Sequence, residues 1–550
     1  MTVHRSRRRL LSAAATVTAA VLVATGCSAS SEPEEQTLYV LTSSAEIGFD
    51  PATAVDLPTT WLGLVGRRLT TWEVGDGGTP EVVPDLATDT GTVSDDGLTW
   101  TYTLKDDVLF EDGTPITAAD IKYGVERTYA AELSGGLTYH KGLLAGDAEY
   151  AGPYDGAELD SIETPDDSTI VFHLSTPFGD WPWIVAMNPF IPVPADQDDP
   201  AVYATDPVAS GPYQVESNKT GSETVLVRNE HWDSATDDVR TADPDCIVFR
   251  QNQNPATVTQ SLIADACTAR NSINSEPLGA ADLALVDGDP GAQERLVRSD
   301  GGALTYLALN VDRPALADVR VRQAIEYAID RRSLIVAQGG EETASPATTL
   351  IGPGIPGYEE YDLYPAGDTG DVEKAKELLS EAGMADGVTL DLWVANSETD
   401  QAQAQAVQQG LARAGITVEI HPLDFASMYG DVMGGNPDYD LLLSWWVPDY
   451  PSGAASIKLR YDTAMIDGGS NFSRYSEPEV DALMGEATAE SDPDAAAELW
   501  GAIDQRIMAD APTVPLFYSR SAFLAGSNVS DYFVPAYPSF QNYLKISVGE

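Results

Sequence analysis

The chain has 550 residues, of which 43% are hydrophobic and 21% are charged, and its formal net charge at pH 7 is −55. This length and composition predict a globular protein with about three or four domain-sized units. Such a negative surface repels nucleic acid and anionic lipid, because phosphates are neutralised by clusters of Lys and Arg.

The first 26 residues have the features of an export signal. They contain four arginines and no acidic residue. The arginines are followed by an apolar stretch of 17 residues, Leu10 to Gly26, which is shorter than the roughly 20 residues of a membrane-spanning helix. The segment "SRRRLL" is similar to a twin-arginine signal, and a plain secretory signal fits as well. Without this segment the chain loses four positive charges, and its formal net charge becomes −59.

Small residues lead from the apolar stretch to Cys27. The segment "VATGC" resembles the lipobox of bacterial lipoproteins, in which the signal is cut before a cysteine that then carries the lipid. We therefore expect a signal peptide over residues 1–26, lipidation of Cys27 and a flexible polar tether over residues 27–36. This anchor would hold the protein at the extracellular face of the cytoplasmic membrane.

Two further cysteines remain, Cys246 and Cys267. An even pair of cysteines in an exported chain favours a disulfide, which we expect here. The sequence contains no C-x-x-C pair and no Cys/His cluster, so it predicts no metal site.

The first half of the chain predicts strands. Trp100, Tyr102 and Leu104 alternate along "WTYTL", and "DSTIVFHLS" repeats this period of two, which is typical of half-buried strands. Thr117 and Asp120 then form a capping box, which predicts a helix from this point onward.

The second half predicts helices that alternate with strands. Helices are expected after Asp318, over 371–383, over about 400–414 and near 425–433, with strands at 388–394, from 416 and over "YDLLLSWW". The order strand, helix, strand predicts parallel strands joined by a right-handed crossover. Ligands of open α/β sheets lie beyond the carboxyl ends of the strands. Trp446, Asp449 and Tyr450 follow such an end.

The same residues favour binding over catalysis. The sequence has no H-E-x-x-H, no G-x-S-x-G, no P-loop and no dinucleotide fingerprint, so we expect neither an enzyme nor a cofactor. Trp445 and Trp446 offer stacking surface, and Asp449 offers a carboxylate for an ammonium or guanidinium group. Two alternatives stay open: one of the adjacent tryptophans packs in the core, and Asp449 caps a turn or a helix.

The stretch from Asp95 to Arg127, "DDGLTWTYTLKDDVLFEDGTPITAADIKYGVER", closely resembles the signature of the family-5 extracellular solute-binding proteins. These are the peptide- and nickel-type substrate-binding components of bacterial ABC importers. Further segments of the family pattern follow in the same order and extend the resemblance over residues 37–550: "PVASGPY", "VRNEHWD", "TYLALNVDRPALADVRVRQAIEYAID" and "DAPTVPLF".

The resemblance implies an α/β protein of the two-lobed periplasmic-binding-protein type, in its large three-domain form with mixed sheets and a hinge. Mapped onto this sequence, domain I comprises residues 37–70, 205–304 and 516–550, domain II residues 71–204, and domain III residues 305–515. The hinges are expected near Tyr306 and just after Pro515.

The resemblance also implies the function. The expected protein is a monomeric receptor that closes over a solute and delivers it to the transmembrane permease subunits of an ABC importer. In the family's peptide binders a Trp-x-x-Asp element receives the amino terminus of the peptide, and Trp446 to Asp449 match it. Ser452 and Gly453 depart from the usual continuation, so an oligopeptide or dipeptide is the leading solute while sugars, opines and metal chelates stay open. A secreted enzyme or a surface sensor on the same scaffold is the alternative of another class.

Overall fold

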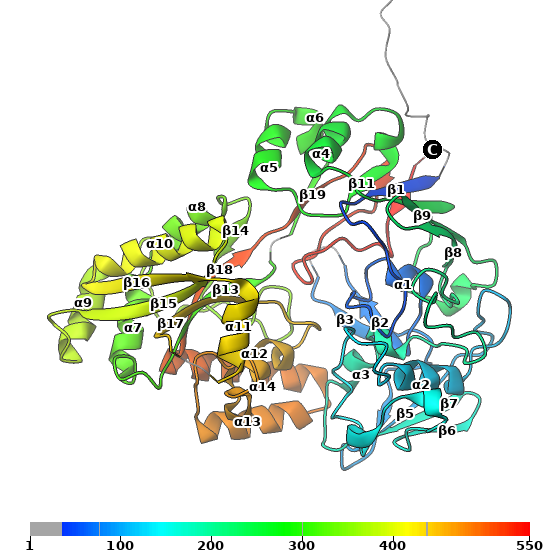
Figure 1. Cartoon of the computed structure of the whole chain (residues 1–550), viewed down its shortest axis with the longest axis horizontal. Helices are drawn as coiled ribbons and strands as arrows, with labels where there is room; N and C mark the ends of the chain where they lie inside the picture. The colour runs from blue at the N-terminus through cyan, green and yellow to red at the C-terminus, as the bar shows by residue number, and fades with distance from the viewer. Residues whose placement is uncertain (1–35, 76–77, 300, 436–437, 550) are drawn as a thin grey trace, which may run out of the picture.

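The computed structural model describes residues 36–75, 78–299, 301–435 and 438–549. The predicted signal peptide, Cys27 and the tether up to residue 35 lie outside the described residues. The described chain forms two lobes (Figure 1). Lobe 1 contains the described residues of 36–298 and 522–549, and lobe 2 contains those of 304–519.

Lobe 1 has a five-stranded mixed sheet at its centre. The order of the strands across this sheet is β11 (Ser272–Asn274), β1 (Thr37–Leu41), β10 (Cys246–Arg250), β9 (Glu223–Arg228) and β8 (Tyr213–Lys219). Strand β1 is parallel to both β10 and β11, whereas β10, β9 and β8 pair in antiparallel fashion. The helices of this part are α1 (Leu62–Val65), α4 (Pro255–Ala264), α5 (Ala280–Asp287) and α6 (Pro290–Gln293).

A second part of lobe 1 is inserted between β1 and β8. Its antiparallel sheet has the order β4 (Thr92–Val93), β5 (Thr99–Thr103), β7 (Thr169–His173) and β6 (Ile162–Asp166). Trp100, Tyr102 and Phe172 are buried, as the alternation predicts. Helix α2 (Ala118–Arg127) begins with the predicted capping box. The remaining elements are the hairpin of β2 (Thr70–Glu73) and β3 (Glu81–Pro84) and the short helix α3 (Trp181–Ile184).

Lobe 2 has a six-stranded mixed sheet. Its order is β14 (Ala344–Pro346), β18 (Thr513–Ser519), β13 (Leu304–Leu309), β17 (Leu441–Trp446), β15 (Val388–Ala395) and β16 (Ile416–Leu423). The predicted parallel unit is confirmed, because β15 is parallel to both β16 and β17. The helices are α7 (Val319–Ala328), α8 (Arg331–Gln338), α9 (Val372–Glu381), α10 (Glu398–Ala412), α11 (Phe425–Met433), α12 (Gly453–Tyr461), α13 (Pro478–Ala489) and α14 (Pro493–Asp510).

The chain passes between the lobes in two short stretches. Strand β12 (Leu296–Arg298) ends just before β13 begins, and β18 ends just before β19 (Ala522–Leu524) begins. Strands β12 and β19 pair on the lobe 1 side, and β13 and β18 pair on the lobe 2 side. Each crossing is therefore held between two pairs of antiparallel strands, and Tyr306 and Pro515 face each other in the pair that belongs to lobe 2.

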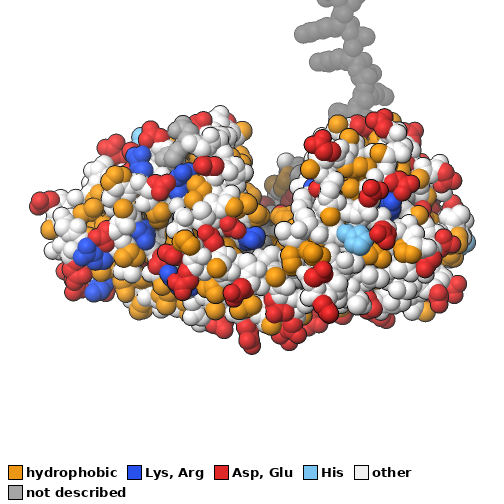
Figure 2. All heavy atoms as spheres, turned by 90° about the horizontal axis from the view of Figure 1, so that it is seen from below, with side chains coloured by type: hydrophobic (Ala, Val, Ile, Leu, Met, Phe, Trp, Pro, Cys, Tyr) orange, Lys and Arg blue, Asp and Glu red, His pale blue; other side chains and the backbone are white. Residues whose placement is uncertain are grey.

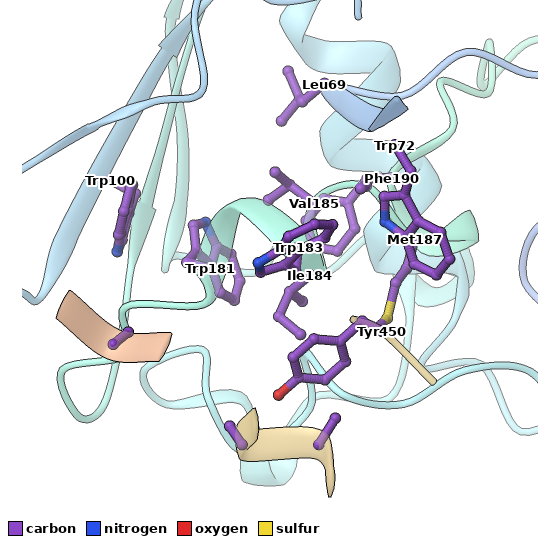
Figure 3. Close-up of a cluster of buried hydrophobic side chains, with 14 of the residues drawn as sticks. Leu69, Trp72, Trp100, Trp181, Trp183, Ile184, Val185, Met187, Phe190 and Tyr450 are labelled. Carbon is purple, nitrogen blue, oxygen red and sulfur yellow. The ribbon is translucent and has the colours of Figure 1, made fainter. Parts of the chain in front are cut away.

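One hydrophobic core extends across the boundary between the lobes. Trp72, Trp181 and Phe190 of lobe 1 belong to the same cluster of buried side chains as Tyr450 and Trp500 of lobe 2. Figure 3 shows Tyr450 beside the lobe 1 side chains of this cluster. Helices α12 to α14 and the inserted part of lobe 1 therefore pack against each other like parts of one core.

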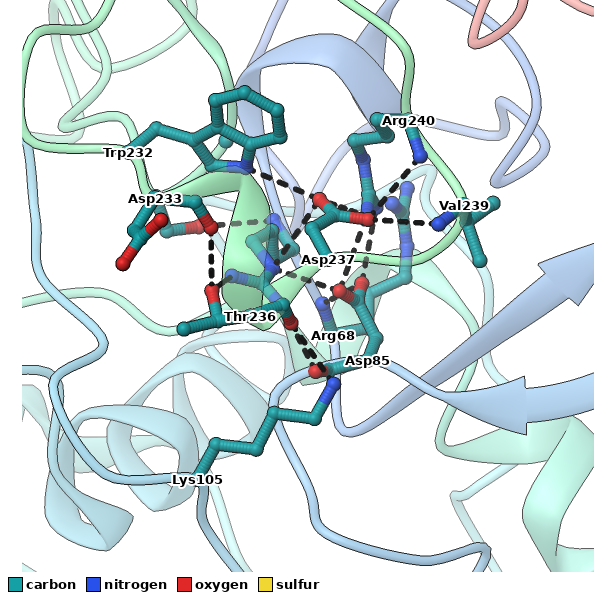
Figure 4. Close-up of polar contacts among 12 residues, drawn as sticks. Arg68, Asp85, Lys105, Trp232, Asp233, Thr236, Asp237, Val239 and Arg240 are labelled. Atoms are coloured by element: carbon teal, nitrogen blue, oxygen red, sulfur yellow. Dashed lines mark hydrogen bonds and ion pairs between the residues drawn. The ribbon is translucent and has the colours of Figure 1, made fainter.

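A buried network of charges joins the two parts of lobe 1 (Figure 4). Arg240 pairs with Asp85 at 2.9 Å and with Asp237 at 3.0 Å, and Arg67 pairs with Asp85 at 2.7 Å. These four side chains are at most 2% exposed. Because buried charges are costly unless they are paired, the network fixes the hairpin of β2 and β3 against the five-stranded sheet.

The expected disulfide between Cys246 and Cys267 is wrong, because no disulfide joins these two residues in the structure. Cys246 opens β10, whereas Cys267 lies in the 3₁₀ turn that leads directly into β11. Strand β1 lies between β10 and β11.

Among the residues that the structure describes, no helix has both the length and the apolar character needed to cross a membrane.

Candidate functional site

The space between the lobes is the candidate site. Figure 2 shows the surface hollowed between them, with acidic side chains more numerous than basic ones on this face. Two cavities here contain residues that the sequence predicted. We call them the interlobe cavity, which contains Asp449, and the strand-end pocket, which contains Trp445.

The interlobe cavity has a volume of about 690 Å³ and is lined by both lobes. Lobe 1 contributes the loop of residues 136–143 and Phe178, and lobe 2 contributes Asp449, Tyr450 and side chains of α12. The loop comes from the inserted part of lobe 1, and Asp449 follows the carboxyl end of β17. The cavity thus lies where the sheet topology predicts a ligand.

Asp449 is a half-buried carboxylate at the wall of this cavity. The Tyr139 hydroxyl, 310 positions away in the sequence, donates a hydrogen bond to Asp449 Oδ2. Burial raises the pKa of Asp449, and this hydrogen bond partly opposes that effect. Among the described residues, no cationic group pairs with the Asp449 carboxylate within 4.0 Å. A carboxylate in this setting can accept a cationic group from a ligand.

The two lysines of the same cavity are held by other groups. Lys141 Nζ donates to the backbone oxygen of Thr128 at 2.7 Å. Lys458 Nζ lies 3.3 Å from Oδ2 of Asp462, the residue that follows α12. Neither lysine therefore neutralises Asp449, although both remain within the cavity lining.

The strand-end pocket has a volume of about 290 Å³ and lies in lobe 2. Its walls come from the carboxyl ends of β15 and β17, the start of β13, the end of β18 and the first turns of α10 and α11. Trp445 is 52% exposed and Phe425 is 50% exposed, and Tyr429 lies against Phe425 with 4.7 Å between the ring centres. The lining residues are Ala303, Thr305, Gln338, Ala395, Ser397, Thr399, Asp400, Gln403, Phe425, Met428, Tyr429, Leu443, Ser444, Trp445 and Ser519.

The structure separates the four residues that the sequence placed at the site. Trp445 lines the strand-end pocket, and Asp449 and Tyr450 line the interlobe cavity. Trp446 lies in the lining of neither: its indole Nε1 donates to the Ala455 oxygen at 2.9 Å, and the Arg460 guanidinium is 5.7 Å from its ring centre. Successive strand residues point to opposite faces, so Trp445 and Trp446 necessarily separate in this way.

Tyr450 is only 3% exposed and packs in the shared core. Its ring meets the edge of Tyr139 with 5.6 Å between the centres. Its main contribution is therefore to hold Tyr139, and with it the hydrogen-bond donor of Asp449, in place.

Direct contacts between the lobes surround the interlobe cavity. The Ser452 hydroxyl donates to Asp180 Oδ2 at 2.5 Å, and the Gly179 N–H donates to the Thr488 oxygen at 2.8 Å. Burial raises the pKa of Asp180 to about 6, and the hydrogen bond from Ser452 lowers this pKa by a smaller amount. The Tyr537 hydroxyl, from the last part of lobe 1, donates to the Pro448 oxygen at 2.7 Å. Ser452 also caps α12, so this departure from the family pattern has a structural role.

The sequence did not identify Tyr139, because no local pattern connects a loop tyrosine to a carboxylate in the other lobe. Asp400 and Phe425 could have been found. Both stand in the first turn of helices that follow predicted strands, and the rule that placed Trp446 at the sheet edge places them there too.

A cluster of potential metal ligands lies outside the cleft. Among the described residues, Asp391, Glu419 and His421 bring their ligating atoms within 4.8 Å of one another on β15 and β16. His421 Nε2 is already 2.8 Å from Asp391 Oδ1, and Glu419 and His421 are exposed. We assign no metal to this surface cluster.

These features define a class: a two-lobed solute-binding protein whose ligand is enclosed between lobes joined by a hinge of paired strands. The family model of the bacterial extracellular solute-binding proteins, family 5, middle region, matches residues 81–466. The chain belongs to this family of substrate-binding components of ABC importers. The resemblance found in the sequence and the predicted fold class are therefore confirmed.

Relatives and solved structures agree over most of the chain. The chain is 25% identical over 472 residues to the probable D,D-dipeptide-binding periplasmic protein DdpA of Escherichia coli K12, covering 83% of each chain. It is 28% identical over 456 residues to the glutathione-binding protein GsiB of Salmonella paratyphi A, covering 80% of this chain and 82% of the relative. Among solved structures, the clavulanic acid biosynthesis oligopeptide binding protein 2 has 31% identity and a TM-score of 0.84, covering 94% of this chain and 97% of that one.

Proposed function

We propose that this protein is the receptor of an ABC importer for oligopeptides or dipeptides, and that Asp449 binds the amino terminus of the peptide. The observation that supports this most directly is the Asp449 carboxylate at the wall of the interlobe cavity, with a hydroxyl donor but no cationic partner among the described residues. A peptide ammonium group would supply the missing positive charge.

The position of the cavity links binding to closure. A ligand there contacts the loop of lobe 1 that carries Tyr139 and the residues of lobe 2 that include Asp449. Because such a ligand binds both walls only when the lobes are together, it favours the closed over the open state. The closed form would then dock on the permease.

The relatives support a peptide as the solute. DdpA is described as binding D,D-dipeptides and GsiB as binding glutathione, and the similar solved structure is an oligopeptide binding protein. A sugar, an opine or a metal chelate is the alternative solute, and an enzyme or a surface sensor the alternative role. The signal peptide of residues 1–26 and lipidation of Cys27 remain part of the proposal, which places a monomer at the extracellular face of the cytoplasmic membrane.

Native mass spectrometry of protein purified from its own host tests the class of solute. A mixture of short peptides that leaves on denaturation is the expected result. A co-purified oligosaccharide would contradict the peptide proposal.

Calorimetry with trialanine and its N-acetylated form tests the role of Asp449. We expect Asp449→Ala to weaken the binding of trialanine by about tenfold or more, which is about 1.4 kcal/mol. Acetylation should cost the wild type a similar amount and cost the variant little, because both changes remove the same ion pair. Equal binding of both peptides by the wild type would refute this role.

A further inference from the structure

The strand-end pocket combines aromatic faces with hydrogen-bond acceptors and has no basic residue. No Lys, Arg or His is among the described residues that line it, and Asp400 is its acidic residue. The rings of Trp445, Phe425 and Tyr429 contribute to the same wall. Aromatic faces carry negative partial charge, so such rings together with a carboxylate attract cations.

Asp400 is positioned by its own helix. The Ser397 hydroxyl donates to Asp400 Oδ2 at 2.6 Å, and the Asp400 N–H donates to Ser397 Oγ at 3.0 Å. This reciprocal cap holds the carboxylate at the first turn of α10, and among the described residues no ion pair involves it within 4.0 Å. Its second oxygen is available to a donor from the pocket.

The side-chain oxygen of Gln403 is a buried acceptor without a donor, and this observation is independent of Asp400. Gln403 is 3% exposed and its Nε2 donates to Gln338 Oε1 at 2.7 Å, but its own Oε1 has no hydrogen-bond partner. Buried polar atoms are nearly always paired in folded proteins. Gln403 lines the pocket, but its Oε1 has almost no accessible surface, so a donor from a bound group reaches this oxygen only if the Gln403 side chain shifts.

We propose that the strand-end pocket binds a positively charged group of the solute, an ammonium or a guanidinium, and that the imported solutes are basic peptides. That the solute is a peptide rests on the proposed function. The preference of the pocket for a cation does not depend on it. A second acidic cavity, of about 390 Å³ in lobe 1, is lined by Glu46, Asp56 and Glu276 and by no described basic residue.

The spacing of the two sites fits a short peptide. Trp445 and Asp449 are four residues apart, so their Cα atoms are separated by at most about 14 Å. An extended peptide of about four residues covers this distance. This upper bound is within the reach of one short peptide, and the proposal is that one solute places its amino terminus at Asp449 and a basic side chain among Trp445, Phe425 and Tyr429.

Peptides that differ in a single side chain test the inference. The probes are Ala-Lys-Ala, Ala-norleucine-Ala and Ala-Glu-Ala, measured by calorimetry on the full chain. We expect the lysine peptide to bind about tenfold tighter than the norleucine peptide, which has a similar shape and no charge, and the glutamate peptide to bind most weakly. Equal affinity for lysine and norleucine, or a preference for glutamate, would overturn the inference.

Asp400→Asn isolates the contribution of the pocket, because the amide can still accept from Ser397. The variant should lose most of the preference for lysine while it keeps the affinity for the norleucine peptide. Asp424→Asn is the control: Asp424 is the N-cap of α11, is bonded to the hydroxyl of Ser427 three residues later, and does not line the pocket. If both variants change the preference equally, the effect is one of net charge and the pocket has no specific role.

Small amines separate this inference from the proposed function. Agmatine and cadaverine, with 1-butanol as the uncharged control, are titrated while the fluorescence of wild type and Trp445→Phe is compared. A saturable change with the two amines that the variant lacks supports the cation pocket even if none of the peptides binds. If no peptide binds and neither amine gives this signal, the inference is wrong. If the norleucine peptide binds and the lysine peptide binds no more tightly, the inference fails while the proposed function survives.

Discussion

Gly179 is the position where a single methyl group would separate the two lobes. A Cβ atom at Gly179 would lie 1.6 Å from the backbone oxygen and 2.4 Å from the backbone carbon of Glu490, which follows α13 in lobe 2. The backbone of Gly179 is not in the left-handed region, so alanine is excluded by lack of space and not by its own conformation. Because the obstacle is backbone, the lobes must move apart by roughly 2 Å to restore a normal contact.

The cost of Gly179→Ala follows from the bonds that this movement breaks. The bond from the Gly179 N–H to Thr488 is worth about 1 kcal/mol, and the bond from Ser452 to the Asp180 carboxylate is worth about 1.5–3 kcal/mol. Destabilisation of the closed state by about 2–4 kcal/mol lowers the apparent affinity for a ligand that needs this state by roughly 30-fold to 1,000-fold.

Small-angle scattering and calorimetry measure this prediction together. Gly179→Ala should have a larger radius of gyration than the wild type and a weaker affinity for a peptide mixture. Gly485→Ala is the control, because it lies in α13 at the same side of the molecule and a Cβ there meets no atom within 4 Å. An unchanged radius of gyration together with unchanged affinity would refute the reasoning that the contact at Gly179 belongs to the closed state.

Two further variants test buried charges. Burial raises the pKa of Asp180 to about 6, because the ionised carboxylate is desolvated in the folded protein; this cost is absent below the ordinary value of 3.8 and grows as the pH rises from 3.8 through 6. Asp180→Asn should therefore be more stable than the wild type at pH 7.5 by about 1–3 kcal/mol in the free energy of unfolding, and this gain should vanish near pH 4. Urea unfolding at both pH values measures the difference, and a difference that does not change with pH contradicts the prediction. Asp85→Asn leaves Arg67 and Arg240 without a full counter-charge and should cost about 3–5 kcal/mol in the free energy of unfolding, so an unchanged urea midpoint would show that the network in Figure 4 is not needed for stability.

The elements that the sequence predicted correctly depend on local patterns. The alternation at Trp100 and Tyr102, the capping box at Thr117 and the parallel unit of β15 and β16 all agree with the structure. In each case the deciding interactions lie within one strand, one helix end or one strand–helix–strand unit. The structure adds that β13 lies antiparallel to β17, because the hinge strand enters the sheet from the other lobe.

The site was predictable only in part, since it is made by contacts between distant segments. The sheet-edge rule placed Trp446, Asp449 and Tyr450 at the site, and of these Asp449 and Tyr450 line a cavity. The period of two along a strand meant that one of Trp445 and Trp446 had to turn away, and Trp445 is the one that lines a cavity. The sequence could not say which one. Tyr139 reaches Asp449 from the other lobe. The failed disulfide has the same origin, because a count of cysteines does not show how the chain places Cys246 at the start of β10 and Cys267 in the 3₁₀ helix before β11.

The path of the chain between the lobes determines the order in which the lobes can fold. Lobe 2 is one continuous segment with its own six-stranded sheet and a core of its own, so its fold can form before the last residues are available. Lobe 1 is different: its core contains Leu38 and Val40 near the start of the chain together with Tyr543, Ile546 and Val548 near the end. Loss of the last ten residues would therefore disrupt the core around the first strand and leave the core of the six-stranded sheet of lobe 2 intact.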